Sequence, residues 1–215
     1  MPSAELTNTE QDRTIRTRRA FVDEAERLFA RDGIAATSVT DVVEGAGRSI
    51  GSLYHHFANK EGLVAAVVDR LLGELEERVI SAINPDRWQG ASIRDILTTF
   101  VHSSLETSVA RPGYKRILVE ASFMDPAADD RYRRARQRLD EGLVALLLDR
   151  RVEISHPNPE IPARFAIDQL TSMLAARLEA STPTLLDSAP DETFEQEVLN
   201  AVTGYLGVPP ASANL

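Results

Sequence analysis

The 215-residue chain contains no cysteine. This absence excludes disulfides, thiolate zinc sites and cysteine nucleophiles, and it fits a reducing compartment. Long hydrophobic runs are also missing: the longest aliphatic stretch, Leu143–Leu148, is far too short to span a bilayer. The first residues, MPSAELTNTEQDR, are polar and mixed in charge, unlike a signal peptide. We therefore expect a cytoplasmic protein with no membrane partner.

Strand patterns are not evident, because the β-branched residues fall at helical rather than alternating positions. The apolar fraction of 43% allows a sizeable core. The pattern predicts an all-α protein. Besides two very short helices described next, it predicts helices at about Thr14–Arg31, Lys60–Ile83, Ser92–Val109, Tyr114–Met124, Ala127–Arg150, Pro162–Ala180 and Asp191–Leu206.

The most informative stretch is residues 37–61, TSVTDVVEGAGRSIGSLYHHFANKE. Ser38 is a good N-cap for a first short helix, and Asp41 three residues later makes a variant of the capping box. Gly47 suits a left-handed C-terminal cap, and a second short helix, Ser49–Phe57, can follow with its first residue as cap. A unit this small cannot bury a core alone. It is better suited to presenting one helix to a large, regular partner such as a DNA groove.

The periodicity of the second short helix gives it an inward and an outward face. Leu53 and Phe57 are four residues apart and are expected to point inward. Ser52, Tyr54 and His55 are left for the outer surface. These three side chains are therefore the ones that this helix would present to a partner.

A second motif in the same stretch indicates a different function. Gly47–Gly51 is GRSIG, a literal G-x-S-x-G, as in the nucleophile elbow of serine hydrolases. Candidate partners exist by composition, namely Asp125, Asp129, His102 and His156. The elbow needs a buried strand before it, however, and the preceding residues, DVVEGA, look helical. A serine hydrolase is therefore a minor alternative.

The net charge of −9 is unevenly distributed along the chain. Residues 1–60 hold eight Lys/Arg and nine Asp/Glu, whereas the remaining residues hold 16 and 24. Near the N-terminus, Arg13, Arg16, Arg18 and Arg19 form a run with no acid between them. Cations early in a helix oppose its dipole, so an external anion would help to explain this run, the alternative being simple solvation. A local patch is enough for phosphate contact.

A denser basic run lies further along the chain. It could attract an acidic ligand or DNA. Asp129 and Asp130, however, lie four residues before two of its arginines, which is a favourable helical pairing, so a self-neutralised, solvated face is the better interpretation. The run consists of Arg131, Arg133, Arg134, Arg136 and Arg138.

Beyond residue 84, aromatic and apolar side chains provide candidates for a ligand pocket, although each of them is better explained singly as plain core. His102 could hydrogen-bond a ligand, the simpler interpretation being a satisfied core histidine. No histidine–carboxylate spacing suggests a metal, and no cofactor is expected. The candidate ligand contacts are Trp88, Phe100, His102, Tyr114, Phe123, Met124 and Phe165.

The last two predicted helices each carry a broad apolar face. Phe165, Leu170 and Leu174 contribute to the first face, and Phe194 and Val198 to the second. Either face could be monomer core. The two helices could also pair with their copies in a four-helix dimer interface.

Over about Thr14–Arg70 the sequence resembles the TetR family of transcriptional regulators. The resemblance rests on FVDEAERLFARDGIAATSVTDVVEGAG and on SIGSLYHHFANKEGLVAAVVD. The second string is the more specific, since a small residue, Leu-Tyr-x-x-Phe and then Lys-Glu at this spacing is distinctive of the family. In the remaining two-thirds only helix order and length agree.

The resemblance implies a homodimer with two domains per subunit. Residues 14–74 would form a three-helix DNA-binding head, with the helix-turn-helix at about 37–57, and residues 75–208 a helical domain for effector binding and dimerisation. It implies a ligand-responsive regulator and not an enzyme: a repressor that a small molecule releases from a pseudo-palindromic DNA operator. A helical DNA-binding protein without an effector is a further alternative.

The resemblance also assigns roles to residues of the head. Arg48 and Ile50 depart from the family pattern, which favours a small apolar residue and a polar or basic one at these positions. The gain at Arg48 could restore phosphate contact or give a bidentate reading of guanine. The predicted contacts are Thr40 on the first short helix, Arg48, then Ser49, Gly51 and Ser52 facing bases, and Tyr54, His55 and Lys60 on phosphates.

Overall fold

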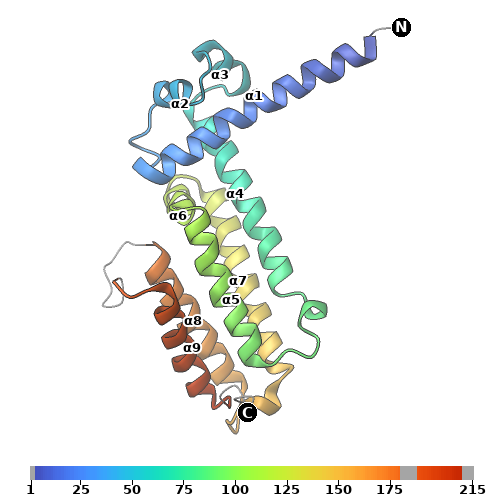
Figure 1. Cartoon of the computed structure of the whole chain (residues 1–215), viewed down its shortest axis with the longest axis vertical. Coiled ribbons are helices and arrows are strands. Elements are labelled where there is room, and N and C mark those ends of the chain that lie inside the picture. Colours follow the sequence, from blue (N-terminus) through green and yellow to red (C-terminus); the bar gives the residue numbers. More distant parts are fainter. Residues whose placement is uncertain (1–2, 180–187, 210–215) are drawn as a thin grey trace. The chain divides into compact units, whose positions relative to one another are not determined.

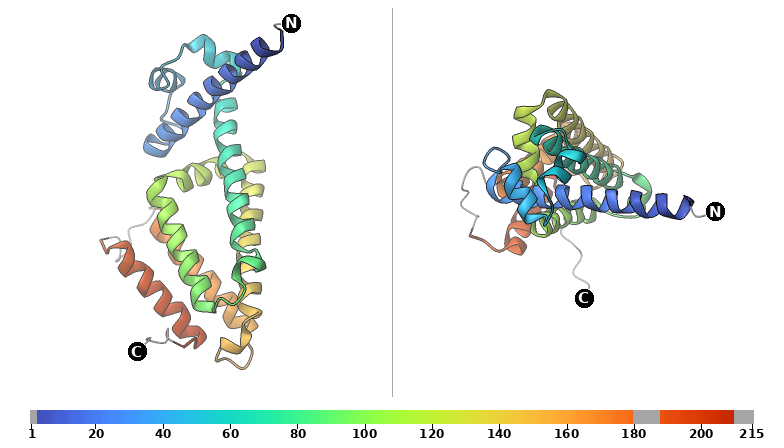
Figure 2. Two further views of the ribbon diagram at one scale, coloured as in Figure 1. Left: turned by 45° about the vertical axis from the view of Figure 1, so that its right-hand side comes forward. Right: turned by 90° about the horizontal axis from the view of Figure 1, so that it is seen from above.

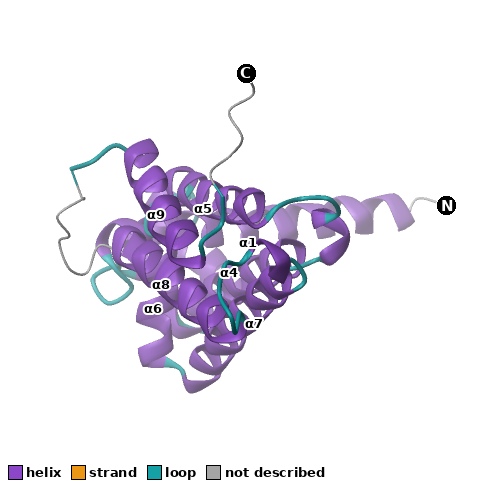
Figure 3. Ribbon diagram, turned by 90° about the horizontal axis from the view of Figure 1, so that it is seen from below, coloured by secondary structure: helices purple, strands orange, loops and turns teal. Residues whose placement is uncertain are grey.

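The computed structural model describes residues 3–179 and 188–209, and all regular elements in these ranges are helical (Figures 1 and 3). The predicted all-α class is therefore confirmed. The helices are α1 (Ser3–Asp32), α2 (Val39–Gly45), α3 (Ile50–His56), α4 (Lys60–Ala82), α5 (Ile93–Ala110), α6 (Tyr114–Met124), α7 (Pro126–Leu148), α8 (Glu160–Glu179) and α9 (Asp191–Leu206), with 3-10 turns at Pro85–Trp88 and Arg151–Glu153.

Most predicted boundaries lie within two residues of the observed ones, and α6 and α9 coincide with their predictions. The predicted end of α8, Ala180, lies outside the described residues. The predicted start of α1 is wrong by eleven residues, since the helix begins at Ser3 and not at Thr14. The first turns of α1 are too polar in sequence to show an apolar period, so periodicity does not reveal them. Those turns project beyond the other helices of the head (Figures 1 and 2).

The chain divides into two compact units that do not follow the order of the sequence. The first contains the described residues up to Glu74 together with Gly113–Arg131. The second contains Leu75–Pro112 and the described residues from Tyr132 onward. Helix α6 is therefore part of the unit that carries α2 and α3, although it follows them by more than fifty residues.

Helix α1 supplies the apolar wall on which the two short helices of the first unit pack. Phe21 of α1 and Leu53 of α3 are fully buried, and Phe57 is 95% buried. The rings of Phe21 and Phe57 meet edge to face with centroids 6.4 Å apart, a favourable aromatic geometry. From α2, Val42 and Val43 are buried. Because α2 and α3 are too short to be stable alone, this packing is what keeps them helical.

The C-terminal end of α1 is bound by α6. The backbone N–H of Ile34 donates to the carboxylate of Glu120 over 2.8 Å. The guanidinium of Arg116 donates to the carbonyl of Phe29 over 3.0 Å. The first bond satisfies a backbone N–H just beyond the end of α1, and the second adds a donor to a carbonyl that already accepts from the Gly33 N–H over 2.9 Å. Helix α6 thus fixes the chain just before the helix-turn-helix.

The second unit has its own apolar core, in which α5, α8 and α9 pack on one another and α7 adds a row of leucines (Figure 1). Members from each helix are almost completely buried. They include Ile96, Leu97 and Val101 of α5, Leu143 and Leu147 of α7, Ile167 and Leu170 of α8, and Val198 and Leu206 of α9.

The close approach of α6 to α1 predicts an unusual sensitivity at Gly113. This residue has a φ of 81°, and a Cβ placed on it would lie 2.7 Å from the carbonyl oxygen of Ala30. Gly90 has a similar φ of 75° but open space around it. Gly90→Ala should therefore cost only the left-handed strain, about 1–2 kcal/mol of unfolding free energy. Gly113→Ala should cost about 1–3 kcal/mol more because of the overlap. Urea unfolding would show both, and equal losses would contradict the close packing of α6 on α1.

Candidate DNA-binding surface

Helix α2 begins with the predicted local bonds, and a short turn joins it to α3. The Ser38 hydroxyl accepts from the Asp41 N–H over 3.1 Å, and the Asp41 carboxylate accepts from the Ser38 N–H over 2.9 Å. The capping box is therefore confirmed. These bonds hold the pKa of Asp41 below its usual value, the side-chain bond with Ser38 being the largest cause. Gly47 has a φ of 61°, as the predicted left-handed cap requires.

Ser49 is the N-cap of α3, and its position removes the basis of the hydrolase alternative. Its hydroxyl accepts from the Ser52 N–H over 3.2 Å. The segment before it is helix α2 and a left-handed turn, whereas a nucleophile elbow needs a strand. Among the candidate partners, His102 lies in the second unit, where its Nδ1 is 3.1 Å from Glu195. GRSIG is thus a turn-and-cap sequence.

The outward face of α3 is the predicted one. Leu53 is fully buried, while Tyr54 is 52% exposed and His55 is exposed beside it. His56 instead turns toward the core, with its ring 6.3 Å from that of Phe21. Burial, and then the neighbouring His55, lower the pKa of His56, which favours its neutral form.

The eight residues predicted to contact DNA all reach the surface of the first unit. The Lys60 ammonium donates to the carbonyl of Ala35 over 3.3 Å, which places it beside the start of the helix-turn-helix. Ser52 and Lys60 are half-buried, and Thr40, Arg48, Ser49, Gly51, Tyr54 and His55 are exposed.

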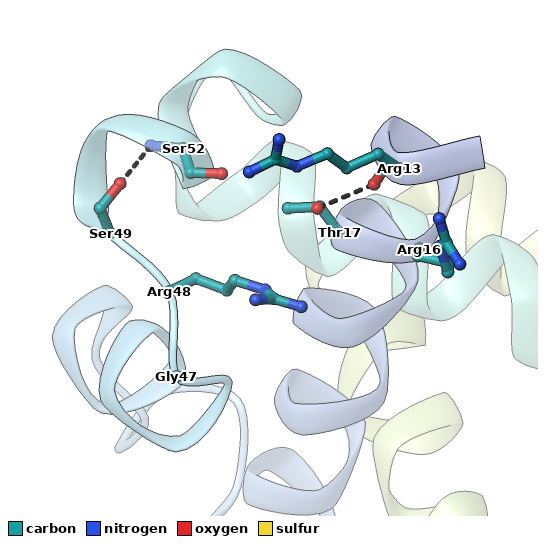
Figure 4. A pocket seen from close by; sticks show the side chains of 7 residues that line it. All are labelled: Arg13, Arg16, Thr17, Gly47, Arg48, Ser49 and Ser52. Atoms are coloured by element: carbon teal, nitrogen blue, oxygen red, sulfur yellow. Dashed lines mark hydrogen bonds between the residues drawn. The ribbon is translucent and has the colours of Figure 1, made fainter. Parts of the chain in front are cut away.

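A concave surface of about 780 Å³ joins the turn before α3 to α1 (Figure 4). Arg13, Arg16 and Thr17 line it from α1, and Gly47, Arg48, Ser49 and Ser52 line it from the other side. Three arginines therefore share a surface whose lining residues include no carboxylate.

The helix-dipole argument for the α1 arginines is wrong, because Arg13 is the eleventh residue of α1 and not one of its first. Their place beside the turn was not predicted, since it depends on how α1 packs.

The candidate ligand contacts are divided between the two units. Tyr114 is buried in the first unit, and Phe123, also in that unit, is 86% exposed. Trp88 and Phe100 pack against the core of the second unit, where the Trp88 indole donates to the Ala82 carbonyl over 2.7 Å. Phe165 is 48% exposed on α8.

His102 is exposed on α5 and is therefore not a core histidine. Its Nδ1 lies 3.1 Å from a carboxylate oxygen of Glu195, and its Nε2 lies 3.3 Å from Glu106. The hydrogen bond with Glu195, followed by the charge of Glu106, raises the pKa of His102. Two carboxylates thus already occupy both ring nitrogens.

An apolar pocket of about 550 Å³ lies within the first unit. Val64, Val68 and Leu72 line it from α4, and Ala121 and Met124 from α6. Among the predicted ligand contacts, only Met124 lines this pocket. Arg131, the first member of the denser basic run, lies at its edge in an ion pair of 2.8 Å with Asp69. Within the described ranges, no cluster of His, Asp or Glu has the size of a metal site.

None of the described helices is both long enough and apolar enough to cross a membrane.

Two family models match the chain. Bacterial regulatory proteins of the tetR family match over residues 21–67, and the tetracyclin repressor-like C-terminal domain matches over residues 92–206. A curated relative, the HTH-type transcriptional repressor KstR2 of Mycobacterium tuberculosis (strain ATCC 25618 / H37Rv), is 44% identical over 71 residues, which are 31% of this chain and 36% of the relative. The chain thus spans only about a third of the length of this relative.

Solved structures match over most of the chain. A TetR-family regulator from Mesorhizobium loti MAFF303099 has a TM-score of 0.66 at 16% identity, covering 90% of this chain and 96% of its own. SCO4454, a TetR-family regulator from Streptomyces coelicolor, has a TM-score of 0.64 at 18% identity, covering 96% of each. At such identities these likenesses establish the fold alone. The second family model spans more than half of the 215 residues, and with it the chain belongs to the TetR family of bacterial transcriptional regulators.

Proposed function

We propose that this chain is a ligand-responsive DNA-binding regulator, a repressor that a small molecule releases from its operator. The observation that carries the proposal is the geometry of α3. A helix of seven residues is held by the buried Leu53 and presents Tyr54 and His55 to solvent, next to a surface of arginines without a lining carboxylate. A basic recognition edge on a chain of net charge −9 needs a local anionic partner. Operator DNA would place the protein in the cytoplasm.

In this proposal α3 enters the major groove and its N-terminal residues face the bases. Ser49, Gly51 and Ser52 occupy that end of the helix. Tyr54 and His55 lie on the exposed flank and bind phosphates, as does Lys60 at the start of α4. Thr40 of α2 approaches the same duplex, and Arg48 lies in the turn between the helices. Residues 14–74 thus form the DNA-binding head.

We further propose that residues 75–208 provide the dimer contact through α8 and α9, as well as effector binding. Phe165 of α8 and Tyr205 of α9 are 48% and 47% exposed, and their rings lie 5.1 Å apart. Ile161, which is 68% exposed, is a further apolar side chain on α8. Exposed aromatic pairs on packed helices are typical of protein interfaces. A two-fold dimer then matches a pseudo-palindromic operator with half-sites about one helical turn apart.

The contacts of α6 support a route from effector to operator. Residues 92–206 match the C-terminal family domain, yet α6 is bonded to the end of α1 through Glu120 and Arg116. A ligand that moves α6 would therefore shift the chain at Ile34, immediately before the helix-turn-helix. The ligand lowers operator affinity only as far as it prefers the state that does not bind DNA. The apolar pocket that contains Met124 lies between α6 and α4, and we expect the effector to bind there, with α6 as the contribution of residues 75–208 and α4 as that of the head.

Replacing Lys60 tests the DNA contact. An operator duplex is first selected from random DNA with the purified protein. Lys60→Gln should then raise the operator Kd and flatten its salt dependence, by about 0.9 in the slope of log K against log salt for each phosphate that is no longer neutralised. Tyr54→Phe should weaken binding as well, since it removes one hydroxyl donor. Arg151→Gln, an exposed arginine of the second unit, is the matched control. Fluorescence anisotropy that finds both head variants equal to the control would refute the assignment.

Replacing Phe165 tests the dimer. Phe165→Glu should convert the protein to a monomer in sedimentation velocity and weaken operator binding at least tenfold, because a charge would be buried in the interface. Val152→Glu changes a side chain that is 93% exposed and belongs to neither α8 nor α9, and should leave the dimer intact. A dimeric Phe165→Glu protein would show that another surface joins the subunits.

Effector binding separates the repressor from a DNA-binding protein that needs no ligand. A thermal-shift screen of small hydrophobic compounds should yield ligands that raise the melting temperature in proportion to log concentration. The same compounds should lower operator affinity in anisotropy. Ligands that stabilise the protein and leave operator affinity unchanged would favour the effector-independent alternative.

A further inference from the structure

The four arginines of the α1 run have different surroundings in the structure. The guanidinium of Arg18 lies over the ring of Phe57, 5.3 Å from its centroid. Arg19 forms an ion pair of 3.6 Å with Asp23, one turn along the helix. Half of the run therefore has a partner within the head. The other half, Arg13 and Arg16, lines the concave surface beside α3.

Arg13, Arg16 and Arg48 all line that surface, and in Figure 4 the side chain of Arg16 points away from the other two. In Figure 4, Arg13 extends from α1 toward Ser52, and Arg48 extends from the turn toward α1. Among the described side chains, no ion pair joins any of these three arginines to a carboxylate. Three positive groups held on one concave surface repel one another unless an anion lies between them. Such an arrangement is therefore expected where the structure receives an external anion.

The surroundings favour the backbone of duplex DNA as that anion. The surface is open and exposed, so a small free ion would be well screened there, whereas a polyanion gains from the release of its counterions. Guanidinium groups bind the two non-bridging oxygens of a phosphate in a bidentate manner. The lining hydroxyls of Ser49 and Ser52 are additional donors, and they belong to α3, which the proposed function places in the groove.

We infer that Arg13, Arg16 and Arg48 form an arginine clamp on the phosphodiester backbone of the operator strand beside α3. The inference rests on the proposed function and extends the DNA-binding surface to a part of α1 that precedes the matched family domain, which begins at residue 21. It also assigns Arg48 to phosphate rather than to guanine. The clamp fixes the register of α3 in the groove without reading sequence.

The test compares two pairs of substitutions on the same helix. Arg13→Gln with Arg16→Gln removes two charges from the clamp. Arg19→Gln with Arg31→Gln removes two charges from α1 that are already paired, with Asp23 and Asp32, and is the matched control. Kd is measured over a KCl series for the selected operator and for an unrelated duplex. Circular dichroism melts verify that both proteins fold.

The clamp pair should flatten the salt dependence by about 0.9 for each phosphate that is no longer neutralised, and the control pair should not. Because phosphates carry no sequence information, the clamp pair should weaken binding to the operator and to the unrelated duplex by the same factor. Arg48→Gln should likewise weaken binding to both duplexes by one factor.

If the clamp pair and the control pair give the same slope of log K against log salt, while Lys60→Gln still flattens that slope, the clamp is overturned and the proposed function stands. A loss by Arg48→Gln on the operator alone would assign Arg48 to a base and overturn its place in the clamp. A native protein that binds neither duplex would reject the proposed function itself.

Discussion

The candidate DNA-binding surface depends on the burial of a few side chains against α1. Helix α3 has seven residues and would not be stable in isolation. Leu53 and Phe57 hold it by packing into the wall that contains Phe21, and the edge-to-face contact of the two phenyl rings fixes its direction. Once that packing is made, the opposite side of the helix has to face outward. The exposed Tyr54 and His55 are thus a consequence of which residues are buried.

Helix α6 extends the same dependence to the later part of the chain. Its carboxylate and guanidinium groups at Glu120 and Arg116 hydrogen-bond to backbone groups at the end of α1, and Gly113 allows the backbones to approach. The unit that carries the helix-turn-helix therefore includes a segment from the region matched by the C-terminal family model. A regulator whose ligand acts on DNA binding needs a physical connection of this kind, since coupling requires a shared element with two arrangements.

Charge on this protein has to be read locally. The total of −9 argues against contact with DNA, yet a concave surface of the head is lined by three arginines and no carboxylate. Other arginines are paired with carboxylates, as Arg19 is with Asp23 and Arg131 with Asp69. Within a Debye length of about 8 Å at physiological salt, such local arrangements outweigh the distant acidic surface.

The sequence by itself determined what depends on neighbours along the chain. The all-α class, most helix ends, the Ser38–Asp41 capping box and the left-handed Gly47 follow from periodicity and from bonds that span three or four residues. Only the tertiary structure decided that α6 belongs with the unit that carries the helix-turn-helix, and that Arg13, Arg16 and Arg48 line one surface. These outcomes depend on side chains far apart in sequence, and they are set by packing, which local pattern does not encode.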